Sequence, residues 1–281
     1  MLSLSGHNWK IGKGAPLAVI AGLNVLEDAE LALEIGASLK QTCQELGLSF
    51  MFKASYDKAN RSSIKSYRGP GLERGLEMLG RVKAELGVPI CSDVHEVGQA
   101  ALIAPIVDLL QIPAFLCRQT DLVVDVATVA EETDRLIHVK KAQFLAPWDC
   151  QNIVAKIGEV TKSERVVLCE RGTSFGYNNL TVDMLGIAEM QKLGTPVTID
   201  ATHAVQLPGA DPRTKGASTG GRREGVSILA RSAVAAGADG VFLEFHRNPD
   251  KALCDGLSCL PISAAAPLLS ELKQIHEIVQ R

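Results

Sequence analysis

Eight short, continuously apolar segments recur along the chain. They span residues 17–22, 49–52, 88–91, 107–110, 136–139, 165–169, 196–199 and 240–243. Segments that are apolar without alternation are typical of parallel strands that helices cover on both faces. We therefore predict eight buried parallel strands.

Segments with helical periodicity lie between these strands. Residues 28–46, 72–86 and 224–236 each carry an apolar stripe, and glycine follows each of them, at positions 47, 87 and 237. Glycine readily takes the left-handed conformation that ends a helix. A fourth helix of this kind, with Leu268, Leu272 and Ile275, closes the chain. Strands that alternate with helices over about 250 residues indicate a (β/α)8 barrel, also called a TIM barrel.

The length of 281 residues fits one such barrel, so we expect a single domain over residues 1–281. Before the first strand, residues 2–15 alternate in the manner of a hairpin, with a turn expected around Gly12 to Gly14. We expect residues 1–16 to plug the bottom of the barrel.

Polar residues lie at nearly every strand end. In a barrel of parallel strands, the carboxyl ends of the strands build the reactive face. The residues that follow the eight apolar segments are Asn24, Lys53, Asp93, Gln111, Lys140, Glu170 with Arg171, Asp200 with His203, and Glu244. This placement predicts an enzyme.

Composition excludes several classes of partner. Charged residues make up 22% of the chain and the formal net charge is −3, so neither nucleic acid nor an anionic membrane is expected. No apolar segment reaches the roughly 18 residues of a membrane span, and no signal peptide is evident. Seven cysteines without a Cys-x-x-Cys pair fit a reducing compartment, so we expect a cytoplasmic protein.

The segment after the second strand is rich in cations. Between Ser55 and Gly71 it carries four cations against one acid, with hydroxyl and amide side chains among them. Such a surface suits an anion with several oxygens, although solvated loops of this composition are also common. Lys140 and Arg171 add cations at two further strand ends, where we expect repulsion to disfavour the fold without an anionic ligand. Since no glycine-rich nucleotide loop is present, side chains are expected to hold the phosphates.

A series of motifs resembles the 3-deoxy-D-manno-octulosonate 8-phosphate synthase family. They are KAS at 53–55, DKANRSS at 57–63, RGPG at 68–71, DVHE at 93–96, QIPAF at 111–115, RQTD at 118–121 and FGYN at 175–178. The resemblance extends from about residue 17 to residue 261. It implies a barrel, usually tetrameric, that condenses phosphoenolpyruvate with D-arabinose 5-phosphate and water, releases phosphate and supplies lipopolysaccharide precursors.

The resemblance also implies roles for individual residues. Phosphoenolpyruvate would contact Lys53, Pro113, Ala114, Arg118, Lys140 and Arg171. D-Arabinose 5-phosphate would contact Lys58, Asn60, Arg61 and Ser62, with Lys58 between the two substrates. The catalytic group around the attacking water and the sugar hydroxyls would be Asn24, Lys58, Asp93, His203, Glu244 and Asp255.

Asn24 bears on whether the protein needs a metal. Some members of the family need a divalent metal, and the resemblance implies a cysteine at this position in those members. An amide donates far less charge to a metal than a thiolate does, so we predict the metal-independent type, with no cofactor. Residues 143–149 and 203–209, however, are more similar to metal-dependent members.

Three other functions stay open on the sequence alone. A related synthase, 3-deoxy-heptulosonate 7-phosphate synthase, would use erythrose 4-phosphate, and a Schiff-base aldolase would use Lys53 or Lys140 as its nucleophile. The third is a barrel that only binds sugar phosphate.

Residues 204–225 are the segment that we expect to move. They contain five glycines, two prolines and several cations, so we predict that they close over a phosphate.

Overall fold

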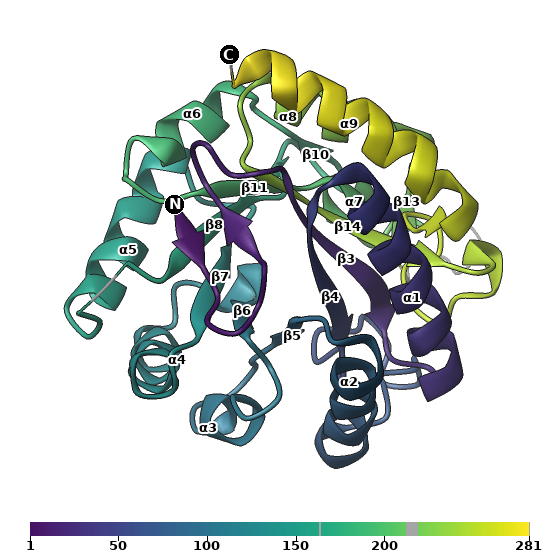
Figure 1. Cartoon of the computed structure of the whole chain (residues 1–281), viewed down its shortest axis with the longest axis horizontal. Coiled ribbons are helices and arrows are strands. Elements are labelled where there is room, and N and C mark those ends of the chain that lie inside the picture. The colour runs from purple at the N-terminus through teal and green to yellow at the C-terminus, as the bar shows by residue number, and fades with distance from the viewer. Residues whose placement is uncertain (163, 212–218, 281) are drawn as a thin grey trace.

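The computed structural model describes residues 1–162, 164–211 and 219–280, and its centre is a closed barrel of parallel strands inside a ring of helices (Figure 1). The barrel strands are β3 (Ala18–Val25), β4 (Ser49–Ser55), β5 (Ile90–Asp93), β6 (Leu109–Ile112), β7 (Leu136–Lys140), β8 (Val166–Glu170), β11 (Val197–Asp200) and β14 (Gly240–His246). Each pairs in parallel with its neighbour, and β14 closes the barrel against β3 with Gly240 opposite Ala18. The predicted (β/α)8 barrel and all eight predicted strands are confirmed.

One helix follows each barrel strand. These helices are α1 (Ala29–Leu46), α2 (Leu72–Leu86), α3 (Gln99–Ile103), α4 (Thr120–Thr133), α5 (Cys150–Gly158), α6 (Leu185–Gln191), α8 (Glu224–Ala235) and α9 (Ala265–Val279), with the short α7 (Ala201–Ala204) directly after β11. An N-terminal cap and the predicted glycine explain the bounds of α1. The Asp28 side chain accepts a hydrogen bond from the Leu31 backbone N–H at 2.7 Å, and Gly47 ends the helix at φ 67°.

Two apolar layers hold the barrel together. Alternate residues of each strand face opposite ways, so that Val19 and Ala21 of β3 pack toward the helices while Ala18 and Ile20 face the barrel interior. The inner layer also includes Met51 and residues of five other strands: Cys91, Leu109, Leu136, Val167 and Phe242.

The N-terminal segment forms the predicted hairpin and plugs the barrel. Strands β1 (Leu2–Ser3) and β2 (Lys10–Ile11) are antiparallel, and four of the segment's apolar side chains pack on the inner layer: Leu2, Leu4, Trp9 and Ile11. The position predicted for the turn was wrong. The chain turns within residues 4–9, where Gly6 has φ 76°, and the glycines at 12 and 14 form the next turn, which leads into β3.

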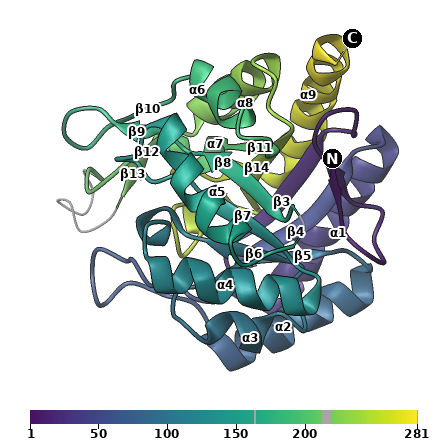
Figure 2. The ribbon, with the colours of Figure 1, turned by 90° about the vertical axis from the view of Figure 1, so that its left-hand side faces the viewer.

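The hairpin lies at one end of the barrel, and short strand pairs lie at the other (Figure 2). The pairs are β9 (Thr173–Ser174) with β10 (Leu180–Thr181) and β12 (Gln206–Leu207) with β13 (Gly220–Gly221); β15 (Leu260–Pro261) extends the sheet beside β14. The second pair belongs to the segment 204–225 that we expect to move, of which residues 212–218 lie outside the described residues. Its closure stays a prediction.

Each barrel strand extends one to three residues beyond its apolar segment, so that most of the polar residues of the strand ends belong to the strands, whereas Arg171 and His203 follow them. Asn24 lies on β3, Lys53 on β4 and Lys140 on β7. β3 and β4 approach so closely here that only glycine fits at position 22. A Cβ on Gly22 would lie 2.1 Å from the carbonyl oxygen of Lys53. In the part of the chain that the structure describes, no helix is long and apolar enough to cross a membrane.

Candidate active site

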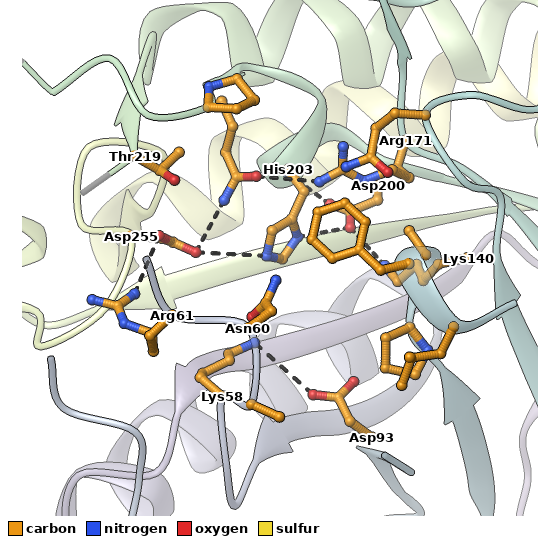
Figure 3. A pocket seen from close by; sticks show the side chains of 18 of the residues that line it. Lys58, Asn60, Arg61, Asp93, Lys140, Arg171, Asp200, His203, Thr219 and Asp255 are labelled. Carbon is orange, nitrogen blue, oxygen red and sulfur yellow. Dashed lines mark hydrogen bonds and ion pairs between the residues drawn. The ribbon is translucent and has the colours of Figure 1, made fainter. Parts of the chain in front are cut away.

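A cavity of about 550 Å³ opens at the carboxyl ends of the barrel strands (Figure 3). Most of the residues predicted from the sequence line it: Lys53, Lys58, Asn60, Arg61, Ser62, Asp93, Pro113, Ala114, Lys140, Arg171, His203 and Asp255. Barrel closure therefore brings together polar side chains from β4 through to the loop after β14.

Three predicted residues are placed differently. Asn24 and Glu244 are buried next to the cavity, where they bind residues that line it. Arg118 is exposed and is absent from the described lining of the cavity, so its contact with phosphoenolpyruvate stays a prediction.

Lys140, Asp200 and His203 form one charged cluster. Lys140 donates to Asp200 Oδ2 at 2.6 Å, and its ammonium lies 3.1 Å from the centre of the Phe242 ring. Asp200 also accepts from the backbone N–H and from Nδ1 of His203, at 2.8 and 2.7 Å. Burial raises the pKa of Asp200, but His203 and Lys140 outweigh it and hold this pKa well below its ordinary value. Because a carboxylate only accepts, Nδ1 of His203 carries a proton and donates it to Asp200.

Lys53 and Glu244 form a second cluster, at 2.6 Å with both side chains fully buried. The other Lys53 donors bind the backbone oxygens of Leu23 and Asn24, at 3.3 and 3.0 Å. Burial raises the pKa of Glu244, but His203 and Lys53 together lower it to about 2. A Schiff-base nucleophile needs a free amine, and an ammonium with three partners does not supply one. This arrangement disfavours Lys53 as the nucleophile of an aldolase.

Asn24 occupies the space between three potential metal ligands. Its Nδ2 lies 2.6 Å from Glu244 Oε2, 3.3 Å from Asp255 Oδ2 and 3.5 Å from His203 Nε2. The Asn24 Oδ1 atom is buried without a hydrogen-bond partner in the described structure. Among the described residues, no group of three or more His, Cys, Asp and Glu side chains has an arrangement that could hold a metal ion.

Arg61 and Lys58 lie on another side of the cavity. Arg61 donates to Cys254 Sγ at 2.6 Å and lies 3.7 Å from Asp255 Oδ1, while Lys58 lies 3.9 Å from Asp93 Oδ2. Burial raises the pKa of Asp93, but Lys58 and Lys53 hold it below its ordinary value. Figure 3 shows Arg61 beside Asp255 at one side of the cavity and Lys140 with Arg171 at the other.

Arg171 differs from the other cations of the cavity. One guanidinium nitrogen donates to Gln206 Oε1 at 3.2 Å, and another, NH1, is buried without a hydrogen-bond partner among the described residues. Within the described ranges, this is the one lysine or arginine of the cavity with no carboxylate within 4.0 Å. Burial therefore lowers the pKa of Arg171.

The expectation that the cations repel one another in the absence of a ligand was wrong. Four of them have a carboxylate partner in the fold, in the pairs Lys53–Glu244, Lys58–Asp93, Arg61–Asp255 and Lys140–Asp200. Sequence reasoning named these carboxylates but not their pairing with the cations, because each pair joins residues of different strands or loops. The argument for an anionic ligand consequently depends on Arg171 and on the free donors of the paired cations.

Several residues of the cavity were not assigned a role from the sequence. Gln111 and Asp200 carry the signal that identified Lys140, because each lies at the carboxyl end of a barrel strand. Gln206 and Cys254 had no such signal, since both lie outside the barrel strands.

Comparison with known proteins adds an independent finding. The sequence profile described as DAHP synthetase I family matches residues 2–281. Three relatives are each named 2-dehydro-3-deoxyphosphooctonate aldolase. The one from Geobacter sp. (strain M21) is 50% identical over 272 residues, covering 97% of this chain and 96% of the relative. The one from Desulfosudis oleivorans is 53% identical over 268 residues (95% and 93%), and the one from Trichlorobacter lovleyi 49% over 277 residues (99% and 98%).

Proposed function

The chain belongs to the DAHP synthetase I family, and on that premise we propose that it condenses phosphoenolpyruvate with D-arabinose 5-phosphate and water. The products are 3-deoxy-D-manno-octulosonate 8-phosphate and phosphate, and the reaction supplies lipopolysaccharide precursors. The observation that carries this function is one cavity with two separate cationic regions, Arg61 at one side and Lys140 with Arg171 at the other. Two such regions suit two phosphorylated substrates that must meet between them.

The phosphoenolpyruvate site would lie at Lys140 and Arg171. The unpaired nitrogen of Arg171 would donate to a phosphate or carboxylate oxygen, and Lys140 keeps a donor beyond the one that binds Asp200. Pro113 and Ala114 line the same cavity. Lys53 would act through its charge, because its three donors already have partners.

The sugar phosphate would bind at Asn60, Arg61 and Ser62, all of which line the cavity. This placement leaves the aldehyde end of the sugar near Lys58, whose ammonium is held beside Asp93. Burial lowers the pKa of Lys58, but Asp93 and Glu244 outweigh it and raise the pKa above its ordinary value. A lysine that stays protonated can donate to the aldehyde oxygen as negative charge develops there.

The reaction forms one carbon–carbon bond between the substrates and one carbon–oxygen bond to water, and it breaks the carbon–oxygen bond to phosphate. The methylene carbon of the enol attacks the sugar aldehyde, and the aldehyde oxygen takes a proton. The positive charge left on the neighbouring carbon is captured by water, which gives up a proton. The resulting tetrahedral intermediate carries both hydroxyl and phosphate. Its carbon–oxygen bond to phosphate then breaks while the hydroxyl gives its proton to the leaving phosphate, which leaves the ketone.

His203 is the group best placed to take the proton of the water. Asp200 fixes its Nδ1–H, so that Nε2 faces the cavity as an acceptor, 3.5 Å from the Asn24 amide. The free Oδ1 of Asn24 would accept from a substrate hydroxyl or from the water. Glu244 and Asp255 complete the polar surround.

One assay tests this function against its rivals. Purified protein should release phosphate from phosphoenolpyruvate with arabinose 5-phosphate, and much more slowly with erythrose 4-phosphate. A preference for erythrose 4-phosphate would identify the related heptulosonate synthase. Binding of both substrates without turnover would favour a sugar-phosphate sensor, and inactivation by borohydride in the presence of substrate would identify a Schiff-base aldolase.

We also propose that the reaction needs no metal. A metal ligand must offer a lone pair, whereas Asn24 directs an N–H group between Glu244 and Asp255. The amide hydrogens of Asn24 thus donate to both carboxylates, in the place that a metal ion would take. Activity that survives exhaustive chelation would support this assignment.

A homotetramer is our proposal for the assembly. Aromatic side chains are exposed on the loops at the cavity end of the barrel, among them Phe115, Phe144, Phe175 and Tyr177, and an interface between copies would bury them. Sedimentation should then give four times the chain mass of 30.0 kDa.

A cytoplasmic location is the last part of the proposal. All seven cysteines are free and buried, which suits a reducing compartment. Cell fractionation with an antibody to the protein would test this.

A further inference from the structure

A chain of hydrogen bonds crosses the barrel interior beneath the cavity. Gln111 donates from Nε2 to Asp93 Oδ1, and its Oε1 lies 2.9 Å from His138 Nδ1. The other nitrogen of that ring, Nε2, lies 2.9 Å from Thr198 Oγ1. Asp93, Gln111 and His138 are register partners on β5, β6 and β7, whereas Thr198 reaches the ring from β11. All four residues are buried, and His138 is fully so.

The direction of every bond in this chain follows from its carboxylate end. Asp93 is ionised and can only accept, so Gln111 must turn its NH2 group toward Asp93 and its oxygen toward His138. Nδ1 of His138 must then carry the proton, since two acceptors cannot bond to each other. Nε2 is left as an acceptor, and the Thr198 hydroxyl is the donor beside it at 2.9 Å. The same hydroxyl lies 3.2 Å from the carbonyl oxygen of Leu168, and its one hydrogen turns to the closer of these two acceptors.

We propose that His138 is a positioning residue for the reaction: its Nδ1–H holds the Gln111 amide against Asp93. This inference rests on the proposed function, in which Asp93 and Lys58 lie at the aldehyde end of the sugar. His138 itself does not line the cavity, whereas Gln111 and Asp93 both do.

The hold on Gln111 is needed because nothing else in the described structure donates to its side-chain oxygen. A buried acceptor without a donor is unfavourable, and Gln111 could relieve this by rotating toward the water of the cavity. Asp93 would then lose one of its two side-chain donors and keep only the Ser55 hydroxyl. The Gln111 side chain would also occupy space that the sugar needs.

The charges around both ends of this chain of hydrogen bonds, at His138 and at Asp93, agree with the proposed role. His138 faces Lys140 on its own strand, Asp200 on β11 and Asp93 on β5; burial and Lys140 lower its pKa well below the ordinary value, so the ring stays neutral. Asp93 faces Lys58, Lys53 and His95, which keep it ionised. The Phe242 ring stacks on His138 at 6.0 Å and fixes the plane of the imidazole.

Two substitutions of nearly equal size separate the donor from the packing. His138→Asn keeps a donor near the position of Nδ1, and His138→Leu removes it, while both leave the same space beside Thr198. We expect His138→Leu to lower kcat/KM for arabinose 5-phosphate about tenfold or more, as when a charged group loses a hydrogen bond, with KM for phosphoenolpyruvate within about twofold. His138→Asn should stay within about threefold of wild type, because the amide replaces the lost donor.

The pH profile supplies a readout that packing alone would not move. Loss of a donor raises the pKa of a carboxylate, so the acid limb of kcat/KM should lie at higher pH in His138→Leu than in wild type or His138→Asn. The shift should vanish when His138→Leu is made in a Gln111→Met background, because His138 acts through Gln111. In wild type, nitrogen-15 NMR of histidine-labelled protein should show Nδ1 protonated and Nε2 bare, without any substrate.

Three outcomes would overturn the inference while the wild type remains active. They are equal losses in the Asn and Leu variants, a Leu variant as active as wild type, and a full effect of His138→Leu in the Gln111→Met background. If the Leu variant does not fold, His138→Asn still tests the inference. Loss of its activity, or an acid limb at higher pH than in wild type, would refute the role assigned to Nδ1–H. A wild type that releases no phosphate would instead refute the proposed function, which the NMR measurement does not depend on.

Discussion

Replacing Arg171 with Met tests the phosphoenolpyruvate site most directly. Methionine keeps an apolar stem of similar length and removes the charge. Because Arg171 has no carboxylate partner among the described residues, its loss leaves no buried anion behind. The effect should therefore appear in substrate binding and turnover, with the fold intact.

The size of the effect follows from the contacts that Arg171 can make. One of its nitrogens is already bound to Gln206 and another has no partner among the described residues, so the guanidinium would contribute one or two charge-assisted bonds to the substrate. Loss of such a donor from a preorganised site costs about 2–4 kcal/mol in the transition state. At about 1.4 kcal/mol per factor of ten, kcat/KM for phosphoenolpyruvate should fall by roughly 30- to 1000-fold.

The same substitution should leave the stability of the free protein unchanged or slightly higher. A buried guanidinium without a partner is itself unfavourable, which is why burial lowers its pKa. Lys53→Met is the matched control, because it leaves Glu244 buried without its ion-pair partner at 2.6 Å. That variant should lose about 3–5 kcal/mol of the free energy of unfolding.

Two measurements decide the prediction. Initial rates of phosphate release over a range of phosphoenolpyruvate concentrations give kcat/KM, and urea unfolding without substrate gives the free energy. A folded Arg171→Met protein with unchanged kcat/KM would refute the assignment of the site. A loss of stability as large as that of Lys53→Met would show that Arg171 supports the fold and not the substrate.

Three further predictions concern the remaining parts of the site. Arg61→Ala should weaken arabinose 5-phosphate much more than phosphoenolpyruvate in calorimetry, because Arg61 lies away from Lys140; equal weakening would mean that its charge acts on the whole cavity. Wild type should keep its activity after exhaustive chelation, and elemental analysis should find zinc bound to Asn24→Cys. If wild type instead contains stoichiometric metal and loses its activity when the metal is removed, the protein belongs to the metal-dependent branch. The pKa of Glu244 lies at about 2 in the folded chain, below the ordinary 4.5, so the contribution of its carboxylate to the free energy of unfolding is full above about pH 5 and is lost as the pH falls toward 2. When the free energy of unfolding is measured at a series of acid pH values, Glu244→Gln should lack this loss, and a pH dependence as steep as that of wild type would contradict the prediction.

The fold was predictable because its signals are local and repeated. Each strand is a short apolar segment, and α1, α2 and α8 each have an apolar stripe with a glycine after it, such as Gly47. The hairpin turn was misplaced because the glycines at 12 and 14 are as typical of a turn as Gly6, and only the packing of Leu2 and Trp9 on the barrel interior selects the register.

The site was predictable as a set of residues and much less as a set of interactions. Parallel strands place all their carboxyl ends at one face, so Lys53, Asp93 and Lys140 had to meet there. Which carboxylate pairs with which cation depends on side-chain directions across the barrel and on loops after β14, and sequence spacing does not encode them. His138 shows the limit most clearly, since an apolar strand gives no sign that its one histidine bonds to two other strands.

The pairing of cations with carboxylates also bears on how the cavity can hold two polyanions. If its lysines and arginines were unpaired, the free protein would be strained by repulsion and by desolvation. Pairing removes this strain and fixes the direction of each donor before the substrates arrive, so little reorganisation is needed when negative charge enters. Arg171 is the exception among the described cations of the cavity, and under the proposed function the substrate would supply the partner that its guanidinium lacks. Under that function, a buried guanidinium that costs stability in the free protein is retained because phosphoenolpyruvate would supply its partner.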